Sequence, residues 1–268
     1  MKLEMNPPNP QLNGQLEGFV TGPEGLIQKG VIAGVTVFLL LLTSAGCRFS
    51  ASGKNALGAQ LHQQGQYTAA LQQFQQVVAD DPTNPDGYYN LAATTHRLAK
   101  QRSDEALFNN AEALYNQCLD HDANHVECHR GLAVLLMDTG RPDRAFALVK
   151  NWASSNPTAA EPRIELARLY EEVGQPETAL KYLEDAVQQD ANNSRAWLAL
   201  ARLRESSGDL PQALQNYQRA LALNNTQPMI AERVAALSRE INSNLDAARS
   251  GAQTQIARPL PYPSTNRY

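Results

Sequence analysis

A repeat of 34 residues constrains this chain more than any other feature of its sequence. Gly140, Gly174 and Gly208 follow one another at intervals of 34 residues. Three further series keep the same interval: Ala145, Ala179 and Ala213; Leu132-Ala133, Leu166-Ala167 and Leu200-Ala201; Trp152, Ala186 and Ala220. Because four series share one period, we predict one structural unit stacked several times rather than a single globular core.

Each unit is predicted to contain two helices. The chain is rich in Ala, Leu, Gln and Arg, which favour helices, and poor in β-branched residues. Apolar residues recur every three or four positions, as in Leu166, Leu169 and Tyr170 and then in Ala179, Leu180 and Leu183. That spacing is typical of amphipathic helices. A step such as Gly174-Gln175-Pro176 marks the turn between them.

Extending the pattern in both directions gives five copies. We place them at 51–84, 85–125, 126–159, 160–193 and 194–227. In the second copy Ala111 follows Ala70 by 41 residues, which predicts 7 inserted residues between its two helices, around Lys100–Leu107, with Ala99 in the place of the turn glycine. One more amphipathic helix, at 228–248, is expected to cap the stack, and 249–268 is expected to be a disordered tail.

The repeated residues resemble the tetratricopeptide repeat family. The first copy carries the family pattern as Leu57-Gly58, Gly65, Ala70, Phe74 and Pro82. The resemblance implies an all-α, right-handed superhelical solenoid that is not an enzyme, needs no cofactor and binds other proteins. It also implies a concave groove, lined by the exposed face of each first helix, that holds a peptide or a helix of a protein partner. By register, the residues predicted to line that groove are Tyr89, Arg97, Arg130, Met137, Arg168 and Arg202.

Substitution of two of the predicted groove residues tests the groove. Replacing Arg130 and Arg168 together by Ala is expected to weaken partner capture and to leave helicity unchanged, because arginine forks suit carboxylates of a bound segment.

The amino-terminal part predicts attachment to a membrane. Residues 1–29 form a polar leader, and residues 30–46 are 17 residues without a charge. At about 1.5 Å per residue that run reaches roughly 25 Å, short of a hydrocarbon core of about 30 Å, which suits a signal segment or a short anchor. Ser44-Ala45-Gly46-Cys47 resembles the lipobox of bacterial lipoproteins, which implies lipidation of Cys47. The alternative is an uncleaved single-span anchor. In both cases 47–50 is a linker, and the repeats face the periplasm or the cell exterior.

Cys118 and Cys128 lie in a segment that also holds His121, His125 and His129. Their spacing matches no zinc signature, and Cys118 occupies a core position of the repeat, so no metal site is predicted. A packed thiol and a Cys118–Cys128 disulfide both stay open, and Cα atoms more than about 7 Å apart would exclude the bond.

We expect a non-enzymatic, membrane-tethered scaffold or adaptor in the cell envelope. The sequence holds no phosphate-binding loop and no metalloprotease or nucleophile-elbow motif, and its net charge of −4 argues against nucleic acid as a partner. One alternative is a chaperone-like accessory subunit of an envelope assembly or of a pilus or secretion machinery. Another is a metal- or redox-responsive module that uses Cys118, Cys128 and the nearby histidines.

Overall fold

A computed structural model describes residues 53–250, with side chains to residue 246. The chain divides into two compact units, 1–49 and 50–268, and the described residues belong to the second. The predicted leader, the hydrophobic run 30–46, the lipidation site Cys47 and the tail from 251 on therefore lie outside the described residues. Within 53–250, no helix combines the length and apolar character that crossing a bilayer requires.

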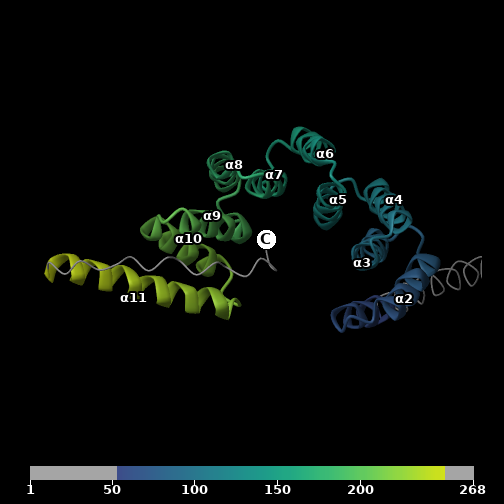
Figure 1. Ribbon diagram of the computed structural model, residues 1–268, viewed down its shortest axis with the longest axis horizontal. Coiled ribbons are helices and arrows are strands. Elements are labelled where there is room, and N and C mark those ends of the chain that lie inside the picture. The colour runs from purple at the N-terminus through teal and green to yellow at the C-terminus, as the bar shows by residue number, and fades with distance from the viewer. Residues whose placement is uncertain (1–52, 251–268) are drawn as a thin grey trace, which may run out of the picture. The chain divides into compact units, whose positions relative to one another are not determined.

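The described residues form helices and contain no strand, as the repeat pattern predicted (Figure 1). A helical stretch at 53–63 comes first. It is followed by α2 (Tyr67–Asp80), α3 (Pro85–Arg102), α4 (Glu105–His121), α5 (Val126–Asp138), α6 (Pro142–Ser155), α7 (Glu161–Glu172), α8 (Pro176–Gln189), α9 (Ser194–Ser206), α10 (Leu210–Leu223) and α11 (Pro228–Ser250).

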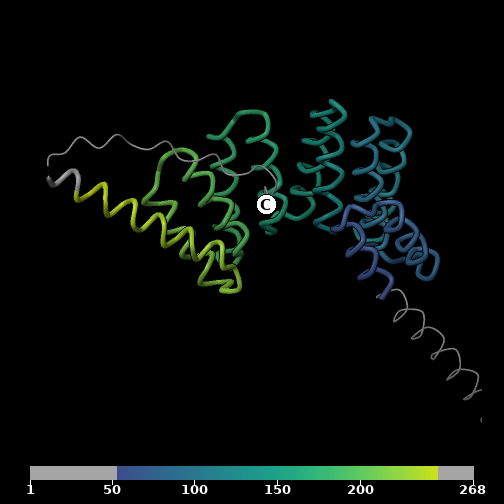
Figure 2. Tube along the Cα trace, turned by 60° about the horizontal axis from the view of Figure 1, so that its bottom comes forward, coloured from purple at the N-terminus to yellow at the C-terminus, as the bar shows by residue number. Residues whose placement is uncertain are grey.

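The helices stack in the order of the chain. From α2 to α11 each helix packs against the next, and Figure 2 shows successive helices side by side. In addition α3 touches α5, α5 touches α7, and α7 touches α9, whereas no comparable contact joins α4, α6 and α8 within the described part. The first helices of the repeats therefore form a continuous row that neighbouring repeats share. The chain is an all-α solenoid of helical hairpins.

Small residues lie at the contacts between the helices of each repeat. Five alanines, one in each second helix, are fully buried: Ala70, Ala111, Ala145, Ala179 and Ala213. The alanines at one equivalent position of the first helices α3, α5, α7 and α9 are also fully buried: Ala92, Ala133, Ala167 and Ala201. A methyl group fills the space between two closely packed backbones and leaves no room for a larger side chain. The alanine series of the sequence thus marks the helix–helix contacts.

The turn inside each repeat needs a residue with left-handed backbone geometry. Gly65, Gly140, Gly174 and Gly208 have φ values between 70° and 84°. A β-carbon is strained in that region, so glycine is the favoured residue. Two second helices, α6 and α8, then begin with proline at the first helical position, where no backbone N–H bond is lost.

The predicted insertion in the second copy is not a loop between its helices. Residues 100–102 and 105–107 are helical, and the turn lies at Ser103, whose φ is 50°. α3 has 18 residues and α4 has 17, against 13 and 14 in α5 and α6. The added residues lengthen each helix by about one turn of 3.6 residues. Ala99 accordingly lies buried within α3 and does not form the turn.

Candidate functional site

The six predicted groove residues lie on the row of first helices. Tyr89 and Arg97 belong to α3, and Arg130 and Met137 to α5. Arg168 belongs to α7 and Arg202 to α9. Their exposure differs: Arg97 is exposed, Arg168 is buried, and the other four are half-buried. The row therefore does not present these six side chains equally to a partner.

A buried carboxylate joins three helices of this row. Glu165 on α7 is 0% exposed. Arg130 Nε on α5 donates to its Oε1 at 2.8 Å, and Arg168 Nε donates to its Oε2 at 3.1 Å. Arg195, on α9, also donates to Oε1. Because the Glu165 carboxylate is buried, leaving it without these arginine donors would cost folding free energy, so the three charge-assisted hydrogen bonds stabilise the stack.

The arginines have further internal partners. Arg168 Nη1 donates to Glu172 at 3.0 Å, and Arg195 pairs with Glu161. Two of the predicted groove arginines, Arg130 and Arg168, thus bind carboxylates of the stack itself. Because of these contacts, replacing Arg130 and Arg168 together is expected to lower the stability of the stack as well as partner capture, so stability has to be measured beside helicity.

Polar contacts also join α3 to α5 at the other end of the row. Asp138 accepts from Lys100 Nζ at 2.8 Å and lies 3.0 Å from His96 Nε2. Burial alone would raise the pKa of Asp138, but the hydrogen bonds from His96 and Lys100 outweigh it, so its pKa is lowered. This part of the row is therefore held together by charge as well as by apolar packing.

The junction between α4 and α5 contains the two cysteines. Cys118 and Cys128 form a disulfide, and their Cα atoms are 6.5 Å apart, within the range that such a bond requires. Both residues are fully buried. Of the three neighbouring histidines, His125 lies beside the sulfurs, whereas His121 stacks on Tyr88 and His129 stacks on Trp152.

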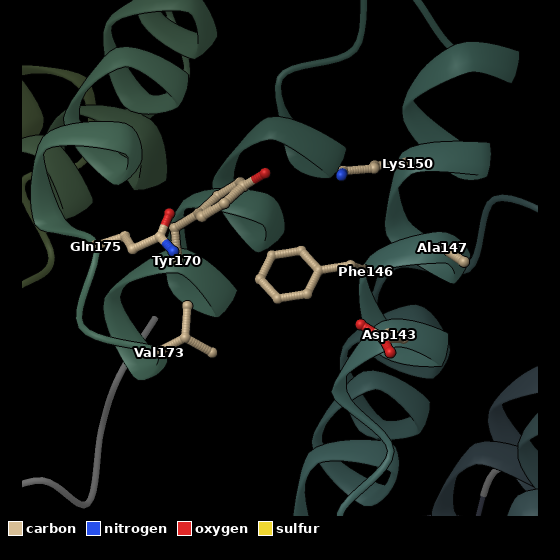
Figure 3. A pocket seen from close by; sticks show the side chains of 7 residues that line it. All are labelled: Asp143, Phe146, Ala147, Lys150, Tyr170, Val173 and Gln175. Carbon is tan, nitrogen blue, oxygen red and sulfur yellow. The ribbon is translucent and has the colours of Figure 1, made fainter.

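An open pocket lies between α6 and the carboxyl end of α7 (Figure 3). We call it the α6–α7 pocket; its volume is about 320 Å³, and it is lined by Asp143, Phe146, Ala147, Lys150, Tyr170, Val173 and Gln175. Figure 3 shows Phe146 from α6 facing Tyr170, and their ring centroids are 4.8 Å apart. Lys150 Nζ lies 5.6 Å from the centre of the Phe146 ring. The pocket therefore combines an aromatic wall with a cation at its rim.

Val173 leaves apolar surface uncovered at this pocket. It is 39% exposed and lies at the turn of the fourth repeat, next to α6 of the third, rather than at an end of the stack. None of the six predicted groove residues lines the pocket. One signal in the sequence pointed to it: the residue before the turn glycine is polar at Gln64, Thr139 and Ser207 but apolar at Val173.

Comparisons with known proteins agree with this architecture. A family model described as "TPR repeat" matches residues 58–98. A second, described as "Tetratricopeptide repeat", matches 104–158, 136–203 and 171–237. No curated protein matches the chain.

Solved structures of TPR proteins are among those similar to this chain, and TTC0263 supports the fold. TTC0263, a thermophilic TPR protein of Thermus thermophilus, is 24% identical with a TM-score of 0.52, over 70% of this chain and 98% of that one. The pilF protein of Pseudomonas aeruginosa is 17% identical with a TM-score of 0.47, over 77% of this chain and 90% of that one. YrrB, described as a TPR protein with an unusual peptide-binding site, is 14% identical with a TM-score of 0.38, over 67% of this chain and 89% of that one.

Proposed function

Since the chain belongs to the tetratricopeptide repeat family, whose members typically bind other proteins, we propose that it is a non-enzymatic scaffold that holds a segment of a partner protein at the α6–α7 pocket. The observation that carries the proposal is the uncovered apolar surface of Val173 beside the ring pair Phe146 and Tyr170. A concave pocket that is lined mainly by apolar and aromatic side chains, with a few polar groups, is typical of binding sites.

The pocket chemistry indicates the partner. A volume of about 320 Å³ suits one large side chain, and the ring faces of Phe146 and Tyr170 favour an aromatic or branched aliphatic anchor. Lys150 at the rim can pair with an acidic residue next to that anchor. We therefore propose an extended partner segment with an apolar anchor and a neighbouring carboxylate. We propose that Tyr89, Arg97 and Met137, on the row of first helices, form a second surface that contacts the same partner segment.

Site-specific crosslinking tests the proposal. A photoreactive residue is placed at Val173, at Met137 or, as a control, at the exposed Lys181 on α8, and the full chain is crosslinked in its native membrane. We expect one partner band at Val173 that is absent at Lys181. A band at Met137 alone would move the contact to the row of first helices.

Substitutions then measure the contribution of the pocket. Val173→Glu places a charge on the apolar wall and is expected to weaken partner binding about 30-fold, the effect of losing a contact of about 2 kcal/mol at an anchor. Lys181→Glu is the matched control, because it changes an exposed charge on the neighbouring helix. Equal binding by Val173→Glu, Lys181→Glu and the unchanged chain would contradict a role for the pocket.

We also propose that the scaffold is tethered to a membrane through its amino-terminal part and faces the periplasm or the cell exterior. The sequence run 30–46 followed by Cys47 supports this. Mass spectrometry of the mature amino terminus tests it. A lipidated Cys47 indicates a lipoprotein and intact residues 1–46 in a membrane fraction indicate an anchor, whereas an intact, unlipidated chain in the soluble fraction contradicts both.

A further inference from the structure

Three metal-ligand side chains meet at the junction between α4 and α5. One sulfur each from Cys118 and Cys128 and one imidazole nitrogen of His125 all lie within 4.8 Å of one another. Cys118 comes from the last turn of α4, His125 caps the start of α5, and Cys128 follows in its first turn. The spacing of these residues matches no zinc signature, but the fold brings them together.

The surroundings of His125 fix which nitrogen can bind a ligand. Its Nε2 lies 3.0 Å from the Asp86 carboxylate, and its Nδ1 accepts the backbone N–H of Cys128 at 3.2 Å. The proton therefore lies on Nε2, and the lone pair of Nδ1 points toward the side of Cys128. A carboxylate that holds the second nitrogen of a histidine is the usual outer partner of a metal-bound imidazole.

The two sulfurs lie in the core, and the imidazole lies at its edge, where His125 is 8% exposed. Sulfur and imidazole ligands in such a setting suit zinc or Cu(I) rather than calcium or magnesium. In the oxidised chain the two sulfurs are bonded to each other, so neither is available as a thiolate ligand.

We propose that reducing the Cys118–Cys128 disulfide converts this junction into a site for one zinc ion, held by both thiolates and by His125. A thiol or phosphine reductant supplies two electrons and breaks the S–S bond, which gives two thiols and the oxidised reductant. Zn²⁺ then displaces the two thiol protons to solvent, and the Nδ1 lone pair of His125 gives up the hydrogen bond from the Cys128 N–H to bind the ion. A water molecule completes four-coordination.

The distances allow this change without moving the helices far. Two sulfurs on one tetrahedral zinc ion lie about 3.8 Å apart, given a Zn–S bond of about 2.3 Å. The Cα separation of 6.5 Å permits either arrangement, because rotation of the cysteine side chains can separate the sulfurs by that amount. The oxidised chain is thus crosslinked between repeats two and three, and the reduced chain is joined there by metal.

Cobalt binding tests the proposal, since thiolate-bound tetrahedral Co²⁺ gives a near-ultraviolet charge-transfer band and strong visible bands. The full-length chain is reduced with a phosphine, freed of reductant without air and titrated with Co²⁺, and then with Zn²⁺ to displace it. We expect one Co²⁺ per chain with these bands, and no bands in the oxidised chain. Absence of thiolate bands in the reduced chain, or loss of its helical circular dichroism, would overturn the proposal.

Variants assign the ligands. His125→Asn keeps a good helix cap but removes the imidazole, and it should weaken Co²⁺ binding at least about 10-fold. His121→Asn, on the exposed neighbouring histidine, should bind as the unchanged chain does. Cys128→Ser leaves Cys118 as the single thiolate of the site and should remove at least about half of the thiolate band intensity. Unchanged binding by His125→Asn or by Cys128→Ser would refute the assignment.

Discussion

Replacing Glu165 by Ala should destabilise the stack more than any exposed charge change in the same row. Glu165 is 0% exposed and accepts from Arg130, Arg168 and Arg195, so its removal leaves three guanidinium groups without their shared carboxylate. Removing one partner from a buried ion pair costs about 3–5 kcal/mol. Arg168 and Arg195 retain other carboxylates, which places the expected loss near the lower end, at about 3 kcal/mol.

Urea unfolding followed by circular dichroism measures this loss. With a slope of about 2 kcal/mol per molar urea, a loss of about 3 kcal/mol lowers the unfolding midpoint by about 1.5 M. Glu172→Ala is the matched control: it also removes a carboxylate from Arg168, but the Glu172 side chain is 37% exposed, so we expect less than about 1 kcal/mol. A midpoint for Glu165→Ala equal to that of Glu172→Ala would refute the reasoning.

Three further predictions concern single positions. Ser103→Gly should raise the free energy of unfolding by about 0.5–1 kcal/mol, because Ser103 has a φ of 50°, and thermal melts showing no gain would contradict this. Gly131→Ala should lower the free energy of unfolding by about 1–2 kcal/mol, since a β-carbon there would lie 2.5 Å from the buried Tyr115 ring. An unchanged midpoint in urea unfolding would mean that the ring moves aside without cost. Burial, and then the charge of Arg97, lower the pKa of His62 below 6.5, so the unfolded chain binds its proton first and stability is lost as the pH falls below about 6.5. His62→Gln should therefore flatten stability measured between about pH 7 and 5, and identical slopes for both chains would disprove it.

Much of the fold was predictable from the sequence, because the repeat imposes the same packing on equivalent residues. Buried alanines such as Ala145 and Ala179, and left-handed glycines such as Gly140 and Gly174, occupy one environment in each repeat. Residues one repeat apart in the sequence therefore have the same burial and the same backbone conformation. The length of the insertion could also be predicted. Whether it enlarges the turn or lengthens the two helices could not be predicted, because the spacing of the repeated residues is the same in both cases.

The partners of the charged residues were harder to predict. Arg130 and Glu165 are 35 residues apart, and Glu161 and Arg195 are 34 apart, so each pair spans about one repeat. Reading each copy by itself leaves Arg130 apparently free for a partner, whereas the carboxylates that Arg168 binds lie three and four residues away on its own helix. Comparing each charge with the residue one period along the chain would have found these pairs. The meeting of His125 with the cysteines needed coordinates, because it depends on the path of the chain between α4 and α5.

The longer hairpin of α3 and α4 sets a rule for which insertions such an array can accept. Counted from Leu91 and from Leu132 to the left-handed residue of the turn, the first helix of this hairpin is four residues longer than that of the next repeat. Counted from that turn residue to Ala111 and to Ala145, the second helix is three residues longer. The family models leave residues 99–103 at the tip unmatched. At about 100° per residue, these additions fall about 40° beyond and about 60° short of a full rotation, so the apolar sides still face the neighbouring repeats. About five residues added before the turn would rotate the point where the chain leaves the first helix by about 140° from its place in the other repeats. Hairpins in this array can therefore lengthen only by about whole helical turns. A further addition of about seven residues, shared between the two helices, would extend the tip and leave the packing of the other residues unchanged.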